Sequence, residues 1–218
     1  GLCGQILFDP GFPDRIILGT VRNEVLISHD KGATWAICEG IRGVPISFHF
    51  DQTSPHGRRR CFAATTAGIW RSDDSGKTWL GKNTGLPTKD IVSFCGASNA
   101  EKKLANLYCS IVSRNKDGRY EGGVFRSSDG GDRWESCMGG GINMDVEKSD
   151  QWADGPVAQY MCVLAADPAP ETLFAFNTST GFNPPKHNAV WRSDDAGRTW
   201  RATLYSDPRW KEYNVEPN

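Results

Sequence analysis

The sequence lacks the long apolar periodicity of a helical protein, and no run of apolar residues is long enough to span a bilayer. Its charges nearly cancel, with 25 Lys and Arg against 26 Asp and Glu, so nothing points to nucleic acid or a membrane surface as a partner. There is no CxxC pair and no Cys/His cluster with the spacing of zinc ligands. We therefore expect no membrane span, no nucleic-acid partner, no metal site and no cofactor.

The chain is rich in turn-forming and aromatic residues instead, with 24 Gly, 12 Pro and 8 Trp among its 218 residues. Short apolar runs alternate with the turn residues, which predicts an all-β protein. Four of the 7 Cys residues lie in such apolar runs, where Cys usually behaves as a small buried hydrophobic residue: Cys61, Cys95, Cys109 and Cys162. We interpret most of the cysteines as reduced and structural.

An eight-residue repeat occurs four times, each time after a short apolar run. Every copy has Ser at the first position, Asp at the third, Gly at the fifth and Trp at the eighth. These invariant residues are Ser28, Asp30, Gly32, Trp35, Ser72, Asp74, Gly76, Trp79, Ser127, Asp129, Gly131, Trp134, Ser193, Asp195, Gly197 and Trp200. Asp closes turns with its carboxylate, Gly permits a positive φ, and Trp covers a hairpin, so we expect structural roles in a β-hairpin.

The pattern S-x-D-x-G-x-T-W resembles the Asp box, or bacterial neuraminidase repeat. This repeat occurs in sialidases, xyloglucanase-type glycoside hydrolases, sortilin-type receptors and a photosystem II assembly factor. In that superfamily the box lies in the hairpin between the third and fourth strands of a β-propeller blade. The resemblance thus implies an all-β propeller, and it favours an extracellular or periplasmic location.

Each repeat closes a unit of four short strands, which is the plan of one propeller blade. We expect four blades, at about residues 4–40, 44–85, 90–138 and 158–205. Asp-box propellers usually have six or more blades, and an open arc of four would leave strand edges and core exposed. We therefore predict part of a larger propeller, completed by a longer parent chain or by another subunit. A closed ring of four blades is the alternative.

The longest segments between predicted strands are 113–122, 138–159 and 178–188. Because antiparallel strands alternate in direction, all three are expected on the rim opposite the repeats. Loops held by a rigid scaffold often carry binding residues. The ligand-binding candidates on this rim are Arg119, Tyr120, Trp152, Phe182 and His187.

Carboxylates beside aromatic rings suit a sugar site, because the rings stack and the acids donate or accept protons. The acids that a hydrolase would use are Asp145, Glu147, Asp150 and Asp154. The arginine triad and Tyr–Glu pair that a resemblance to sialidases implies cannot be placed, so no catalytic set is assigned. A solvated, Gly-rich loop is the favoured interpretation of these carboxylates, and a sugar site is the alternative.

We expect a non-catalytic propeller module that binds a glycan or a protein through its long-loop rim. The alternative is a fragment of a glycoside hydrolase, sialidase-like or xyloglucanase-like, with part of its site in blades outside this chain. A third reading is a structural or assembly scaffold.

Overall fold

The computed structural model of the chain describes residues 3–142, 144, 158–179 and 189–205. These residues form four sheets, each of four antiparallel strands. Within every sheet the strands are hydrogen-bonded in sequence order, so each sheet is a meander built from one continuous stretch of chain.

The strands range from two residues to the 13 of β10, and the fourth strand of each of the first three sheets has only two residues. The first sheet contains β1 (Cys3–Asp9), β2 (Phe12–Thr20), β3 (Val25–Ser28) and β4 (Ala36–Ile37). The second contains β5 (Pro45–Asp51), β6 (Arg60–Thr65), β7 (Gly68–Ser72) and β8 (Leu80–Gly81), with one 3-10 turn at His56–Arg58. The third contains β9 (Ile91–Asn99), β10 (Leu104–Lys116), β11 (Arg119–Ser127) and β12 (Glu135–Ser136). The fourth contains β13 (Ala158–Leu164), β14 (Leu173–Ser179), β15 (Ala189–Ser193) and β16 (Arg201–Tyr205).

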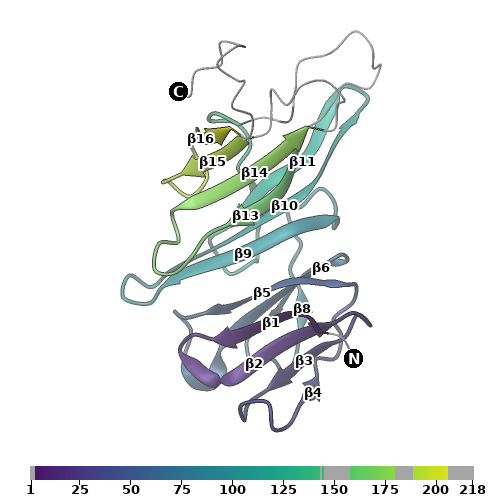
Figure 1. Cartoon of the computed structure of the whole chain (residues 1–218), viewed down its shortest axis with the longest axis vertical. Coiled ribbons are helices and arrows are strands. Elements are labelled where there is room, and N and C mark those ends of the chain that lie inside the picture. The colour runs from purple at the N-terminus through teal and green to yellow at the C-terminus, as the bar shows by residue number, and fades with distance from the viewer. Residues whose placement is uncertain (1–2, 143, 145–157, 180–188, 206–218) are drawn as a thin grey trace.

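The sheets are stacked face to face in sequence order, as Figure 1 shows from purple to yellow. The first strands of successive sheets are in contact, β1 with β5, β5 with β9 and β9 with β13. Four-stranded meanders that stack around their first strands are the arrangement of a β-propeller. The predicted fold class, all-β and part of a propeller, is confirmed.

A separate apolar core fills each of the three junctions between sheets. Successive residues of a strand point to opposite faces, so one strand supplies two cores. In β6, Cys61 and Ala63 pack toward the first sheet, whereas Phe62 and Ala64 pack toward the third. The middle sheets are therefore apolar on both faces, which explains why their strands are continuous apolar runs.

The segment 113–122, expected as a long loop, is mostly strand. β10 and β11 continue past their sheet and pair as far as Lys116 and Arg119. Asp117 (φ 52°) and Gly118 (φ 80°) form the two-residue turn between them, and two successive positive φ angles match the twist of a tight hairpin. The sequence expectation was wrong here because polar residues in a paired, exposed hairpin have the composition of a loop.

The Trp that ends each of the second, third and fourth repeats packs against the sheet before it. Trp79, Trp134 and Trp200 are 7%, 2% and 7% exposed. The backbone N–H of Trp134 donates to the carbonyl of Thr84 at 2.9 Å, and that of Trp200 donates to the carbonyl of Gly140 at 2.7 Å. Trp35, in the first sheet, is 37% exposed.

The outer face of the first sheet is apolar as well. Ile6, Leu18, Leu26 and Ile37 lie opposite one another across its four strands, and so form one row on one face. Ile6 and Ile37 are 53% and 61% exposed. This outer face has the chemistry of a sheet junction but has no neighbouring sheet among the described residues.

Trp200→Ala should destabilise the isolated 218-residue chain more than Trp35→Ala does. Truncating a buried Trp costs about 3–5 kcal/mol of unfolding free energy, and we expect this loss for Trp200. The matched change at Trp35 should cost about 2 kcal/mol less, because part of its ring is already hydrated. Urea unfolding followed by far-UV circular dichroism measures both values. Equal losses would contradict packing of Trp200 against the third sheet as the source of the difference.

Candidate functional site

The four repeats form nearly identical hydrogen-bonded turns. In the second repeat, Ser72 Oγ donates to Asp74 Oδ1 at 2.8 Å and accepts the N–H of Gly76 at 2.8 Å. Asp74 also accepts the backbone N–H of Thr78 at 2.9 Å and its hydroxyl at 2.7 Å. The same Ser–Asp and Ser–Gly contacts occur in the other three repeats. These carboxylates therefore hold the turns.

The fourth position of the repeat adopts a left-handed backbone conformation, although its residue type differs between copies. It has a positive φ in every copy, 61°, 64°, 74° and 60° at Lys31, Ser75, Gly130 and Ala196. The invariant Gly that follows also has a positive φ, and in the second repeat a Cβ at Gly76 would collide with Ile27 of the first sheet. The fifth position thus favours Gly because of its positive φ. In the second repeat, Gly also avoids a clash with the first sheet.

Hydrogen bonds keep the carboxylates of Asp30, Asp74 and Asp195 ionised. The Thr34 hydroxyl, then the Thr34 N–H and the Ser28 hydroxyl, lower the pKa of Asp30 to about 2. At Asp74 burial raises the pKa, but hydrogen bonds from Thr78 and Ser72 outweigh it and the pKa falls to about 2. A group with so low a pKa is a poor proton donor at neutral pH.

Two of the sequence-predicted binding residues are described. Arg119 is exposed and Tyr120 half-buried, both near the tip of the β10–β11 hairpin. β11 begins at Arg119 and ends at Ser127, which is the first residue of the third repeat. Arg119 and Tyr120 therefore lie at the opposite end of the sheet from the repeat. The other candidates lie outside the described residues: Asp145, Glu147, Asp150, Trp152, Asp154, Phe182 and His187.

An axial cavity of about 270 Å³ lies where the first strands of the four sheets meet. Leu7, His49, Gly96 and Leu164 line it, one from each of β1, β5, β9 and β13. The His49 ring stacks on Phe62, with ring centroids 6.2 Å apart. Gly96 lies so close to this ring that a Cβ there would clash with it. The sequence signal for this site was a His inside an otherwise apolar strand.

His49 is a buried base with one neutral partner and two nearby acids. Its Nε2 lies 3.2 Å from Ser98 Oγ. Burial lowers the pKa of His49, and this effect outweighs the carboxylates of Asp167 and Asp51, which raise it. Ser98 of the third sheet donates its N–H to Asp167 of the fourth, and its hydroxyl accepts the N–H of Gln52 of the second at 3.3 Å. Asp51 accepts the Thr53 N–H within the second sheet. The cluster therefore joins the second, third and fourth sheets.

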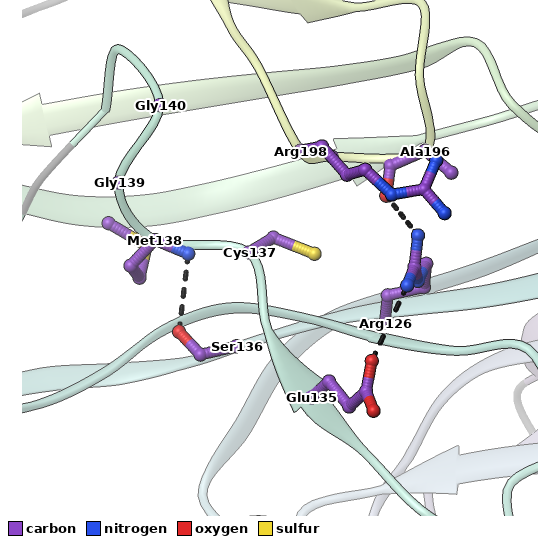
Figure 2. A pocket seen from close by; sticks show the side chains of 10 residues that line it. Arg126, Glu135, Ser136, Cys137, Met138, Gly139, Gly140, Ala196 and Arg198 are labelled. Carbon is purple, nitrogen blue, oxygen red and sulfur yellow. Dashed lines mark hydrogen bonds and ion pairs between the residues drawn. The ribbon is translucent and has the colours of Figure 1, made fainter.

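A second hollow, here called the junction cleft, lies between the third and fourth sheets and has a volume of about 350 Å³ (Figure 2). Its walls include Arg126, Glu135, Cys137 and Arg198, and the backbone of Gly139 and Gly140. Arg126 donates to the Ala196 carbonyl at 3.1 Å and forms an ion pair with Glu135 at 3.4 Å. Sequence reasoning missed this cleft because the sixth position of the repeat, which supplies Arg198, varies between copies.

Burial disfavours the reactive thiolate form at the fully buried cysteines. The six cysteines with described side chains are free, and four of them are buried: Cys38, Cys61, Cys109 and Cys137. In the junction cleft, burial raises the pKa of Cys137 to about 12, although the Arg126 charge opposes this. The thiolate is the reactive form, so Cys137 is unsuited to act as a nucleophile at neutral pH.

The described part of the chain contains no group of three or more His, Cys, Asp or Glu side chains that could hold a metal ion. Among the same residues, no helix reaches the length and apolar character that crossing a membrane requires.

Comparison with known proteins supports the fold and leaves the function open. No protein-family model matches the sequence. A crystal structure of an ancestral GH74 enzyme superimposes with a TM-score of 0.59 at 16% identity, over 95% of this chain and 24% of the enzyme. The GH74 enzyme of Niastella koreensis superimposes with a TM-score of 0.60 at 16% identity, over 92% of this chain and 30% of the enzyme. The chain thus spans less than a third of either enzyme, and at this identity the likeness shows a β-propeller fold alone.

The buried His49 should make the chain less stable below neutral pH. Its folded pKa lies below that of the unfolded chain, so as the pH falls through about 6.5 the unfolded state takes up a proton that the folded state refuses. His49→Gln should flatten the loss of unfolding free energy between pH 7 and pH 5 by up to about 1.4 kcal/mol per pH unit. Urea unfolding at several pH values measures this slope. Parallel curves for the two proteins would show that His49 titrates normally in the folded state.

Proposed function

We propose that this chain is a section of a larger Asp-box β-propeller that acts as a non-catalytic binding module for a glycan or a protein. The remaining blades come from a longer parent chain or from another subunit. The partner binds on the rim opposite the repeats, where the β10–β11 hairpin extends beyond its sheet.

The proposal of a larger propeller rests on the exposed apolar outer face of the first sheet. In the other three sheets the repeat Trp is at most 7% exposed, because the preceding sheet covers it. Trp35 is 37% exposed and lies on the same sheet as the open row that ends in Ile6 and Ile37. Apolar surface of this kind is normally buried against another protein surface. A preceding blade with the geometry of the three observed junctions would cover it.

The observation that favours binding on the opposite rim is the β10–β11 hairpin. Ser113 still bonds Gln159 of the fourth sheet, and beyond it the two strands carry the exposed residues Arg114, Lys116 and Arg119. Pairing of the two strands continues as far as Lys116 and Arg119, so the hairpin stays formed beyond its sheet. Charged groups beside an aromatic ring, here Tyr120, suit both sugars and protein surfaces.

The buried carboxylates of Asp9 and Asp51 hold structural contacts and are not offered as hydrolytic acids. Asp9 is an ion-pair partner of Arg15 at 2.6 Å and Arg59 at 3.0 Å and accepts the N–H of Gly11. Asp51 accepts the N–H and hydroxyl of Thr53. Carboxylates saturated in this way lack the free oxygens that acid and base roles need. A glycoside hydrolase fragment, the alternative, would need two carboxylates facing one cleft roughly 5–10 Å apart.

Tyr120→Ala should weaken partner binding by the intact protein about tenfold, because an aromatic contact contributes on the order of 1–2 kcal/mol. Glycan and peptide arrays would identify a ligand, and titration calorimetry would compare the variants. Arg119→Ala should weaken binding as well, and Trp152→Ala tests the sequence-predicted part of the same rim. Lys102→Ala removes an exposed charge from the turn at the opposite end of β10 and serves as the matched control. Binding that is unchanged in the three rim variants would refute the proposed rim.

A further inference from the structure

The junctions between the sheets differ in how they neutralise one arginine. The residue before the repeat Ser is Arg71 in the second sheet and Arg126 in the third. Both side chains are largely buried, with 13% and 14% of their surface exposed. Both donate to a carbonyl of the next sheet's repeat, Gly130 at 2.8 Å and Ala196 at 3.1 Å. The two guanidinium groups therefore occupy equivalent places.

Arg71 is neutralised on two sides by carboxylates of the protein itself. Asp73 lies 3.0 Å from its Nε, and Asp132 of the next repeat lies 3.0 Å from its Nη1. Asp132 is also held by Lys82 Nζ at 2.5 Å. Hydrogen bonds from Lys82 and Arg71 lower the pKa of Asp132, so the carboxylate stays charged. The junction between the second and third sheets is closed by these contacts.

Arg126 lacks carboxylates at the two positions equivalent to Asp73 and Asp132. Ser128 stands where the second repeat has Asp73, and Arg198 stands where the third repeat has Asp132. Among the described residues Arg126 has one ion pair, with Glu135 at 3.4 Å, and that carboxylate side chain is 60% exposed. The place of Asp132 is thus taken by a second cation beside an almost buried guanidinium.

The junction cleft opens at this position. Figure 2 shows the guanidinium groups of Arg126 and Arg198 on the same side of it. Arg198 is exposed, and its Nη1 contacts only the Asp195 carbonyl, at 3.4 Å, among the described atoms. Guanidinium groups bind carboxylates through paired, charge-assisted hydrogen bonds, and such bonds are screened less where the site is partly buried.

We propose that the junction cleft binds a carboxylate group, which takes the place that Asp132 fills at the neighbouring junction. A uronic acid of a glycan or an acidic side chain of a protein would supply this carboxylate. The site lies at the repeats, at the opposite end of the sheets from the β10–β11 tip. It goes beyond the rim proposed above, and either site can fail without the other.

The proposal is tested by titrating the intact protein with glucuronate and with a short glutamate-containing peptide, followed by NMR at two salt concentrations. Glucose and the corresponding glutamine peptide are the uncharged controls. We expect shifts of the Arg126 and Arg198 side-chain signals with the acids alone, and weaker binding at high salt. Binding of glucuronate only, of the peptide only or of both supports the site and distinguishes the source of the carboxylate. Equal binding of the uncharged controls, or no binding of either acid, overturns the proposal.

Arg198→Asp places an Asp at the position that Asp132 has in the third repeat. The new carboxylate should pair with Arg126 and so compete with an added acid. We expect at least a tenfold rise in the Kd of the acids, as well as an increase in the melting temperature of the chain. Lys77→Asp makes the same charge change at the same repeat position of the second sheet, where the preceding sheet has Ile27 in place of the arginine. It should leave the Kd unchanged.

Arg198→Gln provides a second variant that removes the charge without adding a carboxylate. It should also raise the Kd several-fold while the fold, checked by circular dichroism, is retained. Acid binding that survives in both Arg198 variants, or that Lys77→Asp weakens equally, would overturn the assignment to the junction cleft.

Discussion

Contact of Trp79, Trp134 and Trp200 with the sheet before each of them is the interaction on which the stack depends. The indole N–H of Trp134 reaches the Lys82 carbonyl at 2.9 Å, and that of Trp200 reaches the Cys137 carbonyl at 3.1 Å. The hydrogen-bonded turn of the repeat holds the Trp ring in position. Packing between sheets therefore depends on the hydrogen bonds of the turn. A sheet of four short strands cannot bury both of its faces alone, and this contact joins it to a neighbour.

Much of the fold was accessible from the sequence because the repeat acts locally. Ser, Asp and Gly specify a turn within eight residues, and the apolar run before each copy identifies a strand. The extension of β10 and β11 was not accessible, since pairing depends on the two-residue turn at Asp117 and Gly118 and not on composition. The left-handed conformation at Lys31 and Ala196 was hidden too, because neither residue type favours it.

The candidate sites were harder to predict than the fold, for a different reason. The axial cavity needs β1, β5, β9 and β13 side by side, and the junction cleft needs the repeat of one sheet set against the sheet before it. Neither adjacency is encoded within a single repeat. Arg119 and Tyr120 were expected on the rim opposite the repeats, and their binding role stays a prediction, as do those of Trp152, Phe182 and His187.

Each junction also has its own polar contacts. Asp9 of the first sheet meets Arg59 of the second, Arg71 of the second meets Asp132 of the third, and Gln159 of the fourth sheet bonds both the N–H and the carbonyl of Ser113 in the third. Chains of similar repeats are prone to misassembly during folding, when one unit docks on the wrong copy. Here an incorrect pairing would leave the guanidinium of Arg59, which is 1% exposed, without Asp9 as its counter-ion. Because the polar contacts differ from junction to junction, they favour one order of these similar sheets over the others.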